Sequence, residues 1–201
     1  MAINLANNNS LANITALPSS VSGGGMTLLA TQTASGSANL SFTSGIDDTY
    51  DSYVFKLINI HPATNSADFS FQADTGTNTN YNQTITSTNF RTYHKEDNSD
   101  ANLSYDSSSD LAQSTSFQQI IPDLSNSNDS SGSGTLQLFN PSSATFVKHF
   151  ISNVNYHHPN VASKQQFVAG YFNITTAITR VQFKFSSGNI DSGVIKLYGI
   201  S

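Results

Sequence analysis

Two adjacent histidines, His157 and His158 in the segment NYHHPN, are the side chains best suited to chemistry, because an imidazole can bind a metal or change its charge near neutral pH. Neighbouring residues of a strand point to opposite faces, however, and Pro159 follows directly. We therefore interpret the pair as part of a solvated turn. His61 and His149 are expected in a turn and in a strand, and no spacing joins the histidines into a set of metal ligands.

Clustered acidic residues are the second candidate for a site. Asp47, Asp48 and Asp51 form one group, and the stretch from Glu96 to Asp100 forms another. Calcium prefers clustered oxygen ligands of this kind, but neither group has the spacing of a known calcium loop. We predict no metal and no cofactor.

Tyrosines set among asparagine and aspartate are the third candidate. Carbohydrate-binding β-sandwiches dock sugars on aromatic faces with nearby amide or carboxylate groups, although this chain lacks tryptophan, the aromatic residue most enriched at interfaces. The alternative is that these tyrosines pack their loops onto the domain. The possible glycan or receptor contacts are Tyr81, Tyr93, Tyr105, Tyr156, His157 and His158.

Catalytic motifs are missing from the sequence. We find no nucleophile elbow, no zinc-protease helix motif, no phosphate-binding loop and no dinucleotide fingerprint, and the acids fall mostly in polar turns. We therefore expect a protein that is not an enzyme. A polysaccharide-degrading enzyme is the remaining catalytic alternative, and it would need two carboxylates roughly 5 to 10 Å apart across a cleft.

The composition limits the partners. Of the 201 residues, 10% are charged, the net charge is −5, and there is no cysteine. Without a basic surface, nucleic acid is not an expected partner. The chain has no apolar run of membrane-spanning length and no signal-peptide pattern at its start, so we expect no membrane insertion and synthesis in a cytoplasm.

Short apolar and polar alternations of period two begin at Met26 and predict the elements that must position any site. In residues 67–73, Phe69, Phe71 and Ala73 share a buried face while Asp68, Ser70 and Gln72 face water; residues 179–185 alternate in the same way. Further strands are expected around residues 40–42, 53–57, 136–138 and 146–150. Residues 72–111 are expected to form a long polar region with one strand near 90–94.

Many short strands without helices between them favour antiparallel sheets, each with one dry face. We predict an all-β, antiparallel two-sheet β-sandwich, jelly-roll-like, over residues 26–201. Residues 1–25 are expected to form an extended N-terminal anchoring arm that ends in a Gly/Ser hinge. Its scattered apolar residues, which we expect to pack on another chain, are Ile3, Leu5, Leu11, Ile14 and Leu17.

Three groups of motifs carry a resemblance to a known family. They are the glycine-led segment from Gly23 to Thr33 with the turn from Gly45 to Tyr50, the middle segment with Asn140 to Ser143 and Lys148-His149, and the closing run from Ser187 to Ile200. With these motifs the chain resembles small virion structural proteins of tailed phages and prophages, often labelled tail-fibre-like and common in viruses of aquatic bacteria such as cyanophages. Residues 72–111 match nothing in that family.

The resemblance implies a surface accessory component of a tailed-phage virion, either a tail-fibre or tail-associated protein or a capsid decoration or cement protein. Residues 1–20 would contact other virion proteins of the capsid or tail, and the protein would be made in the cytoplasm of the host bacterium. By analogy with other virion sandwiches we expect a homo-oligomer, with a trimer preferred. The alternative function is a carbohydrate-binding, lectin-like module that recognises the host surface.

Overall fold

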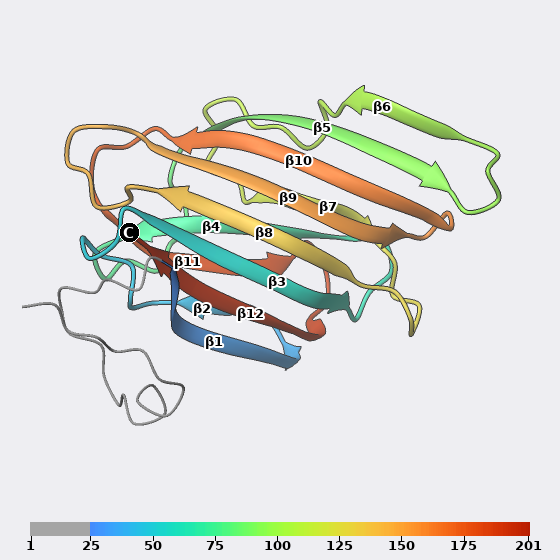
Figure 1. The fold of residues 1–201 in the computed structure, drawn as a ribbon, viewed down its shortest axis with the longest axis horizontal. Coiled ribbons are helices and arrows are strands. Elements are labelled where there is room, and N and C mark those ends of the chain that lie inside the picture. The colour runs from blue at the N-terminus through green and yellow to red at the C-terminus, as the bar shows by residue number, and fades with distance from the viewer. Residues whose placement is uncertain (1–24) are drawn as a thin grey trace, which may run out of the picture.

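The computed structural model describes residues 25–201, which form twelve strands joined by turns (Figure 1). The strands are β1 (Met26–Ser37), β2 (Leu40–Phe42), β3 (Ser52–Pro62), β4 (Ala67–Thr75), β5 (Ile85–Lys95), β6 (Ala101–Tyr105), β7 (Gln118–Leu124), β8 (Gly132–Phe139), β9 (Lys148–His158), β10 (Ala162–Phe172), β11 (Ile178–Phe185) and β12 (Ile190–Ile200). The expected arm and most of its hinge lie outside the described residues.

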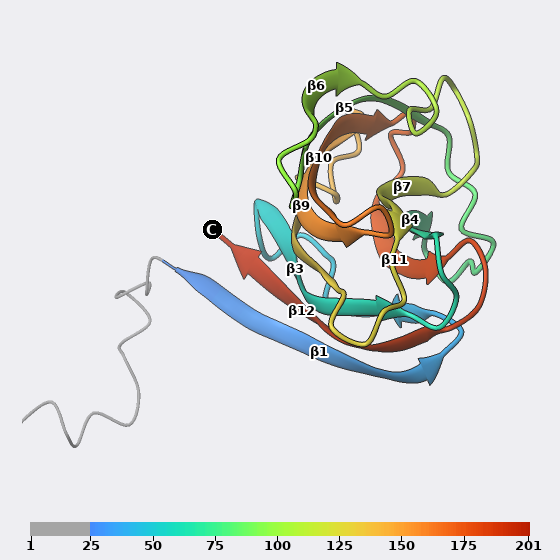
Figure 2. The ribbon, with the colours of Figure 1, turned by 90° about the vertical axis from the view of Figure 1, so that its right-hand side faces the viewer.

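Two antiparallel sheets confirm the predicted all-β sandwich. The large sheet has eight strands in the order β1-β12-β3-β8-β9-β10-β5-β6, and the small sheet has four in the order β2-β11-β4-β7. Figure 2 shows the large sheet curving around the small one. The strands therefore divide eight and four between the two layers, so the large sheet is much wider than the sheet that packs on it.

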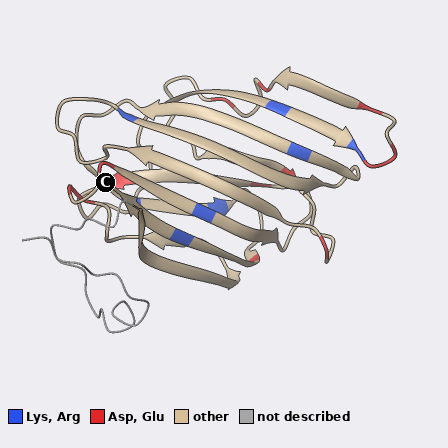
Figure 3. Ribbon diagram, viewed as in Figure 1, with Lys and Arg blue, Asp and Glu red and all other residues tan. Residues whose placement is uncertain are grey.

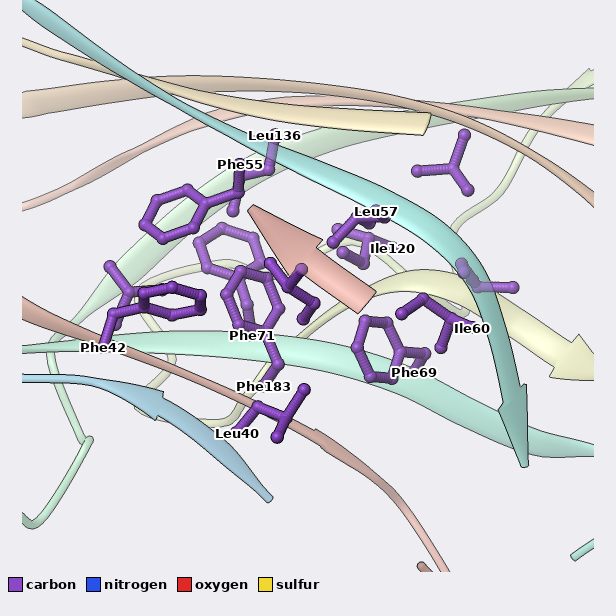
Figure 4. Close-up of a cluster of buried hydrophobic side chains, with 14 of the residues drawn as sticks. Leu40, Phe42, Phe55, Leu57, Ile60, Phe69, Phe71, Ile120, Leu136 and Phe183 are labelled. Carbon is purple, nitrogen blue, oxygen red and sulfur yellow. The ribbon is translucent and has the colours of Figure 1, made fainter. Parts of the chain in front are cut away.

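The core lies between the sheets and is dominated by phenylalanine (Figure 4). Phe183 on β11 lies at its centre, with its ring centroid 5.3 Å from that of Phe55 on β3 and 5.9 Å from that of Phe69 on β4. Edge-to-face and stacked contacts of this kind add to the free energy gained by burying apolar area. Phe183, Phe69 and Phe55 are fully buried, as the alternation of apolar and polar residues in their strands predicts.

The polar side of β4 is buried too, which corrects the expectation that it faces water. Gln72 and Asp74 are fully buried. The amide of Gln72 donates to the carbonyl oxygens of Gln83, Thr115 and Ser116, and Asp74 accepts from the backbone N–H of Tyr81 and from the side chain of Gln83. These hydrogen bonds hold the chain segments around residues 81–83 and 115–116 over the outer face of the small sheet.

The strand expected near residues 90–94 is confirmed as part of β5, but residues 72–111 contain more strand than predicted. They contain the end of β4, all of β5 and all of β6. The additional strand residues were missed because neither β5 nor β6 alternates between apolar and polar residues. On the inner face of β5, Asn89, Arg91 and Tyr93 follow Ile85 and Ser87, so polar side chains take positions that the pattern reserves for apolar ones.

The strand expected around residues 146–150 begins later. Phe146 precedes β9 and is 68% exposed, whereas Lys148, the first residue of β9, is fully buried. Its ammonium group donates to the carbonyl oxygens of Phe146, Ile174 and Thr175 at 2.6, 3.4 and 3.2 Å. Three carbonyl partners compensate for the loss of water around this charge, although burial lowers the pKa of Lys148.

Candidate binding site

The inner face of the large sheet changes from apolar to polar along β10 and β5, toward the turn between β5 and β6. On β10 the inner residues run from Phe172 and Val168 in the core to Gln166 and Lys164, and Lys164 pairs with Tyr93 of β5. Figure 3 shows basic residues on the neighbouring strands β5 and β10 in a molecule with few charges.

A hollow of about 280 Å³ lies at this polar end. Strands β5 and β10 form its floor, and the turns after β5 and β9 supply its rim. Its walls are Arg91, Tyr93, Lys95, Asp100, His158, Asn160, Ala162 and Lys164. Three of the eight lysine and arginine residues of the chain therefore meet at one small site.

A buried hydrogen-bond network supports the hollow from below. Arg91 Nη1 lies 3.2 Å from Asp106 Oδ2, and the amide of Gln166 donates to the same carboxylate at 3.1 Å and to Asn89 Oδ1 at 2.7 Å. Burial opposes ionisation of Asp106, but hydrogen bonds from Ser108 and Gln166 together with Arg91 lower its pKa overall. Arg91 is thus held in place by a charged partner.

The network is incomplete. Four buried polar atoms have no hydrogen-bond partner in residues 25–201, namely Asn89 Nδ2, Arg91 Nε, Tyr156 OH and Gln166 Oε1. A buried polar atom without a partner costs free energy on the order of 1–3 kcal/mol, so each such atom needs an explanation. These four belong to β5, β9 and β10, the strands that also form the hollow.

Lys164 is the most unusual wall residue. Its exposed fraction is only 8%, yet its ammonium group makes no hydrogen bond or ion pair within the described residues. Burial lowers the pKa of Lys164, and the positive charge of Arg91 lowers it further. This ammonium group differs from that of Lys148, which is covered by three carbonyl oxygens.

His158 forms the opposite wall, and it is buried rather than part of a solvated turn. The backbone N–H of Asn160 donates to Nδ1 of His158 at 3.1 Å, while Nε2 lies 3.9 Å from Asp123 Oδ2. Burial, followed by the charge of Lys164, lowers the pKa of His158 to about 4. The imidazole is therefore neutral at neutral pH and acts as a polar wall.

The structure brings together two of the six predicted contact residues. Tyr93 and His158 both line the hollow, and the hydroxyl of Tyr93 donates to Asp100 at 2.6 Å. His157 occupies the other face of β9, where its ring hydrogen-bonds with the hydroxyl of Ser130. Tyr105 is 57% exposed at the end of β6, on the outer face.

Tyr81 and Tyr156 are corrections to the predicted contact set. Tyr81 is 6% exposed and Tyr156 only 2%, and Tyr156 lies on β9 rather than in a loop. Tyr156 belongs to the core between the sheets, and Tyr81 is buried in the segment over the outer face of the small sheet, so neither ring can meet a surface ligand. His61 is also not a turn residue, since it lies on β3 with Nδ1 2.7 Å from the carbonyl oxygen of Ser130. His149 lies on β9, as predicted.

Sequence reasoning missed Arg91, Lys164 and the amides beneath them. The available signal was the parity of two strands: Asn89 and Arg91 on β5, and Lys164 and Gln166 on β10, are spaced two apart and share one face. That signal becomes useful only once β5 and β10 are known to be neighbours.

The described part of the chain, residues 25–201, holds no group of three or more histidine, cysteine, aspartate or glutamate side chains close enough to bind a metal ion. It also contains no helix that could span a membrane. Comparison of the chain with protein-family models, curated proteins and solved structures gave no match.

Proposed function

We propose that this protein is a non-enzymatic structural component of a tailed-phage virion, an accessory protein at the tail or capsid surface that is attached through residues 1–20. Two things support the proposal: the motif resemblance at both ends and in the middle of the domain, and the free edge of β1. The free edge of β1 is the observation that supports a role in assembly, because it is seen in the structure of this chain itself.

Strand β1 is twelve residues long, and within residues 25–201 it pairs only with β12. Its sequence, MTLLATQTASGS, contains neither a charged residue nor proline. A long, uncharged edge strand presents a row of unpaired backbone N–H and C=O groups and is a ready template for another strand. Leu28, on the outer face of this edge, is 52% exposed.

The other three sheet edges are protected in ways that oppose pairing. At the far edge of the large sheet, β6 has five residues, and at one edge of the small sheet β2 has only three. Strand β7, at the remaining edge, contains Pro122 and shows two register shifts against β4. Short strands, proline and bulges are the usual protections of exposed edges. β1 has one register shift against β12, between Leu28 and Ala30, but it is neither short nor interrupted by proline, so it is the least protected of the four edges.

A second copy of the chain is the partner we propose for β1. Pairing of two β1 edges is isologous and closes as a dimer, whereas the trimer favoured by the resemblance needs β1 to meet a different surface of the next copy. Light scattering separates these states, and a monomer at micromolar concentration contradicts both.

Two exposed leucines on opposite edges of the large sheet provide a matched test of the edge contact. Leu28→Lys places a charge on β1, and Leu103→Lys makes the same change on β6, where Leu103 is 65% exposed. We expect the first variant to dissociate and the second to associate as the unmodified chain does. Equal association of both variants would count against a β1 interface.

Attachment through the arm needs its own experiment. A chain that lacks residues 1–20 should keep the sandwich, since the two sheets of residues 25–201 form a core between them, and should no longer be incorporated into particles. Particle purification followed by mass spectrometry measures incorporation. If the truncated chain is incorporated normally, residues 1–20 are not the anchor.

Carbohydrate binding is the second candidate, and one observation favours it: Tyr93 and His158, chosen from the sequence as possible glycan contacts, line the same hollow. Glycan-binding sites commonly combine a few polar groups with an aromatic wall. A glycan array with the full chain tests this candidate independently of particle incorporation.

A further inference from the structure

The hollow between β5 and β10 gathers three cationic side chains, of which only Arg91 is ion-paired within residues 25–201. Arg91, Lys95 and Lys164 line it, while Asp100 is the only carboxylate in its walls. The carboxylate of Asp106 beneath the hollow is engaged by Arg91, Gln166 and Ser108, and Asp100 accepts the hydroxyl of Tyr93. A carboxylate from outside would therefore find two lysines here, Lys95 and Lys164, that make no ion pair within the described residues.

Lys164 is the cation of the hollow that most clearly lacks a partner. The side chain of Lys164 is only 8% exposed, and its ammonium group is accessible from the hollow rather than enclosed in the core. In residues 25–201 no carboxylate lies within 4.0 Å of this ammonium group. An incoming anion would supply the missing partner at a partly buried site, where charge attraction is stronger than in bulk water.

The polar groups in the walls of the hollow also limit what kind of ligand fits. Asp100 offers acceptor oxygens, whereas the side-chain amide of Asn160 can both donate and accept. A simple inorganic anion offers acceptors alone. A hydroxyl group both donates and accepts, either directly or through an ordered water. The ring of Tyr93 adds an aromatic surface to the wall.

We propose that this hollow binds an acidic saccharide, with the carboxylate of a uronic acid on Lys164 and Arg91 and the sugar hydroxyls on the surrounding polar groups. A volume of about 280 Å³ suits one small ligand rather than a long chain. The proposal rests on the carbohydrate-binding candidate and names its sugar class. It is independent of the assembly role assigned to the arm and to β1.

Titration of the isotope-labelled full chain with methyl glucuronide, methyl galacturonide, methyl glucoside and acetate, followed by NMR, tests the proposal. We expect saturable shifts for at least one uronide, centred on residues 91–95 and 158–164, and binding at least tenfold weaker for the glucoside and for acetate. Lys164→Met should weaken uronide binding at least tenfold.

The matched control is Lys56→Met, which removes the same charge from the other face of the same sheet, where Lys56 Nζ lies 5.2 Å from the ring centroid of Tyr198. Uronide affinity should be unchanged in this variant. If circular dichroism shows that Lys164→Met does not fold, Lys95→Met at the rim replaces it, with an expected loss of at least threefold.

Three results would overturn the inference. Uronides that cause no saturable shifts would remove the site, and uronide affinity that survives both lysine substitutions at the hollow would move the ligand elsewhere. Glucoside binding as tight as uronide binding would refute the carboxylate role while leaving the carbohydrate-binding candidate intact. Acetate binding as tight as uronide binding would refute the saccharide.

Discussion

Acid destabilisation through His158 is the prediction that follows most directly from the geometry. Burial and the nearby charge of Lys164 lower the pKa of this imidazole from 6.5 to about 4. The N–H of Asn160 donates to Nδ1, so a proton on Nδ1 would break that hydrogen bond. Arg91 and His157 also disfavour the charged form, whereas Asp123 is the one facing group that favours it.

The sign of the effect follows from proton uptake. Between pH 6.5 and 4 the unfolded chain protonates His158 and the folded chain does not, so acid favours unfolding. The contribution of neutral His158 to the free energy of unfolding is fully present above pH 6.5 and is lost as the pH falls to about 4. The full difference corresponds to about 3 kcal/mol in the free energy of unfolding. Carboxylates such as Asp47 and Asp106, whose pKa lies below 3.8, add their effect at lower pH.

Urea unfolding at pH 7.0, 6.0, 5.0 and 4.5 measures this decrease. His158→Gln, which cannot be protonated, should show a flatter dependence over the same range, with lower stability at pH 7. His94→Gln is the matched control, because it removes an exposed histidine from β5, and it should keep the dependence of the unmodified chain. An unchanged pH dependence in His158→Gln would refute the reasoning.

Three further substitutions test the packing. Phe183→Ala removes the ring at the centre of the core and should cost about 4 kcal/mol in urea unfolding. In Gly134→Ala the new Cβ would overlap the carbonyl oxygen of Asn153 and lie 2.6 Å from Cα of Val154, so we expect a loss of about 3 kcal/mol and a disturbed β8–β9 pair, measured by hydrogen exchange. Lys148→Met leaves three carbonyl oxygens without their donor and should cost about 3 kcal/mol, with faster exchange in the adjoining turns.

The sequence predicts the sandwich well wherever burial is apolar. Strands such as β11 alternate cleanly, with Val181, Phe183 and Phe185 inside, because the hydrophobic effect acts on every second residue of a half-buried strand. The same reasoning fails for Gln72, Asp74 and Lys148. Their burial depends on carbonyl and N–H partners from distant segments, and no local pattern reports those partners.

The candidate site was predictable only in part for a related reason. Tyr93 and His158 attract attention as residue types, but they lie 65 positions apart and meet only because β10 pairs with both β5 and β9. Arg91 and Lys164 look like ordinary solvated charges in the sequence. What distinguishes Lys164 is a largely buried side chain whose ammonium group has no partner within residues 25–201, which only the folded arrangement can reveal.

Strand order separates the two proposed roles in space. In the large sheet β1 is the first strand and β5 the seventh of eight, so the free edge and the hollow lie at opposite ends of one rigid layer (Figure 2). A copy paired along β1 would leave β5, β10 and the hollow uncovered. Leu28→Lys should therefore abolish association without changing uronide affinity, and Lys164→Met should do the reverse. If either substitution impaired both properties, one contact would have to serve both roles, and the division between an attaching edge and a binding end would be wrong.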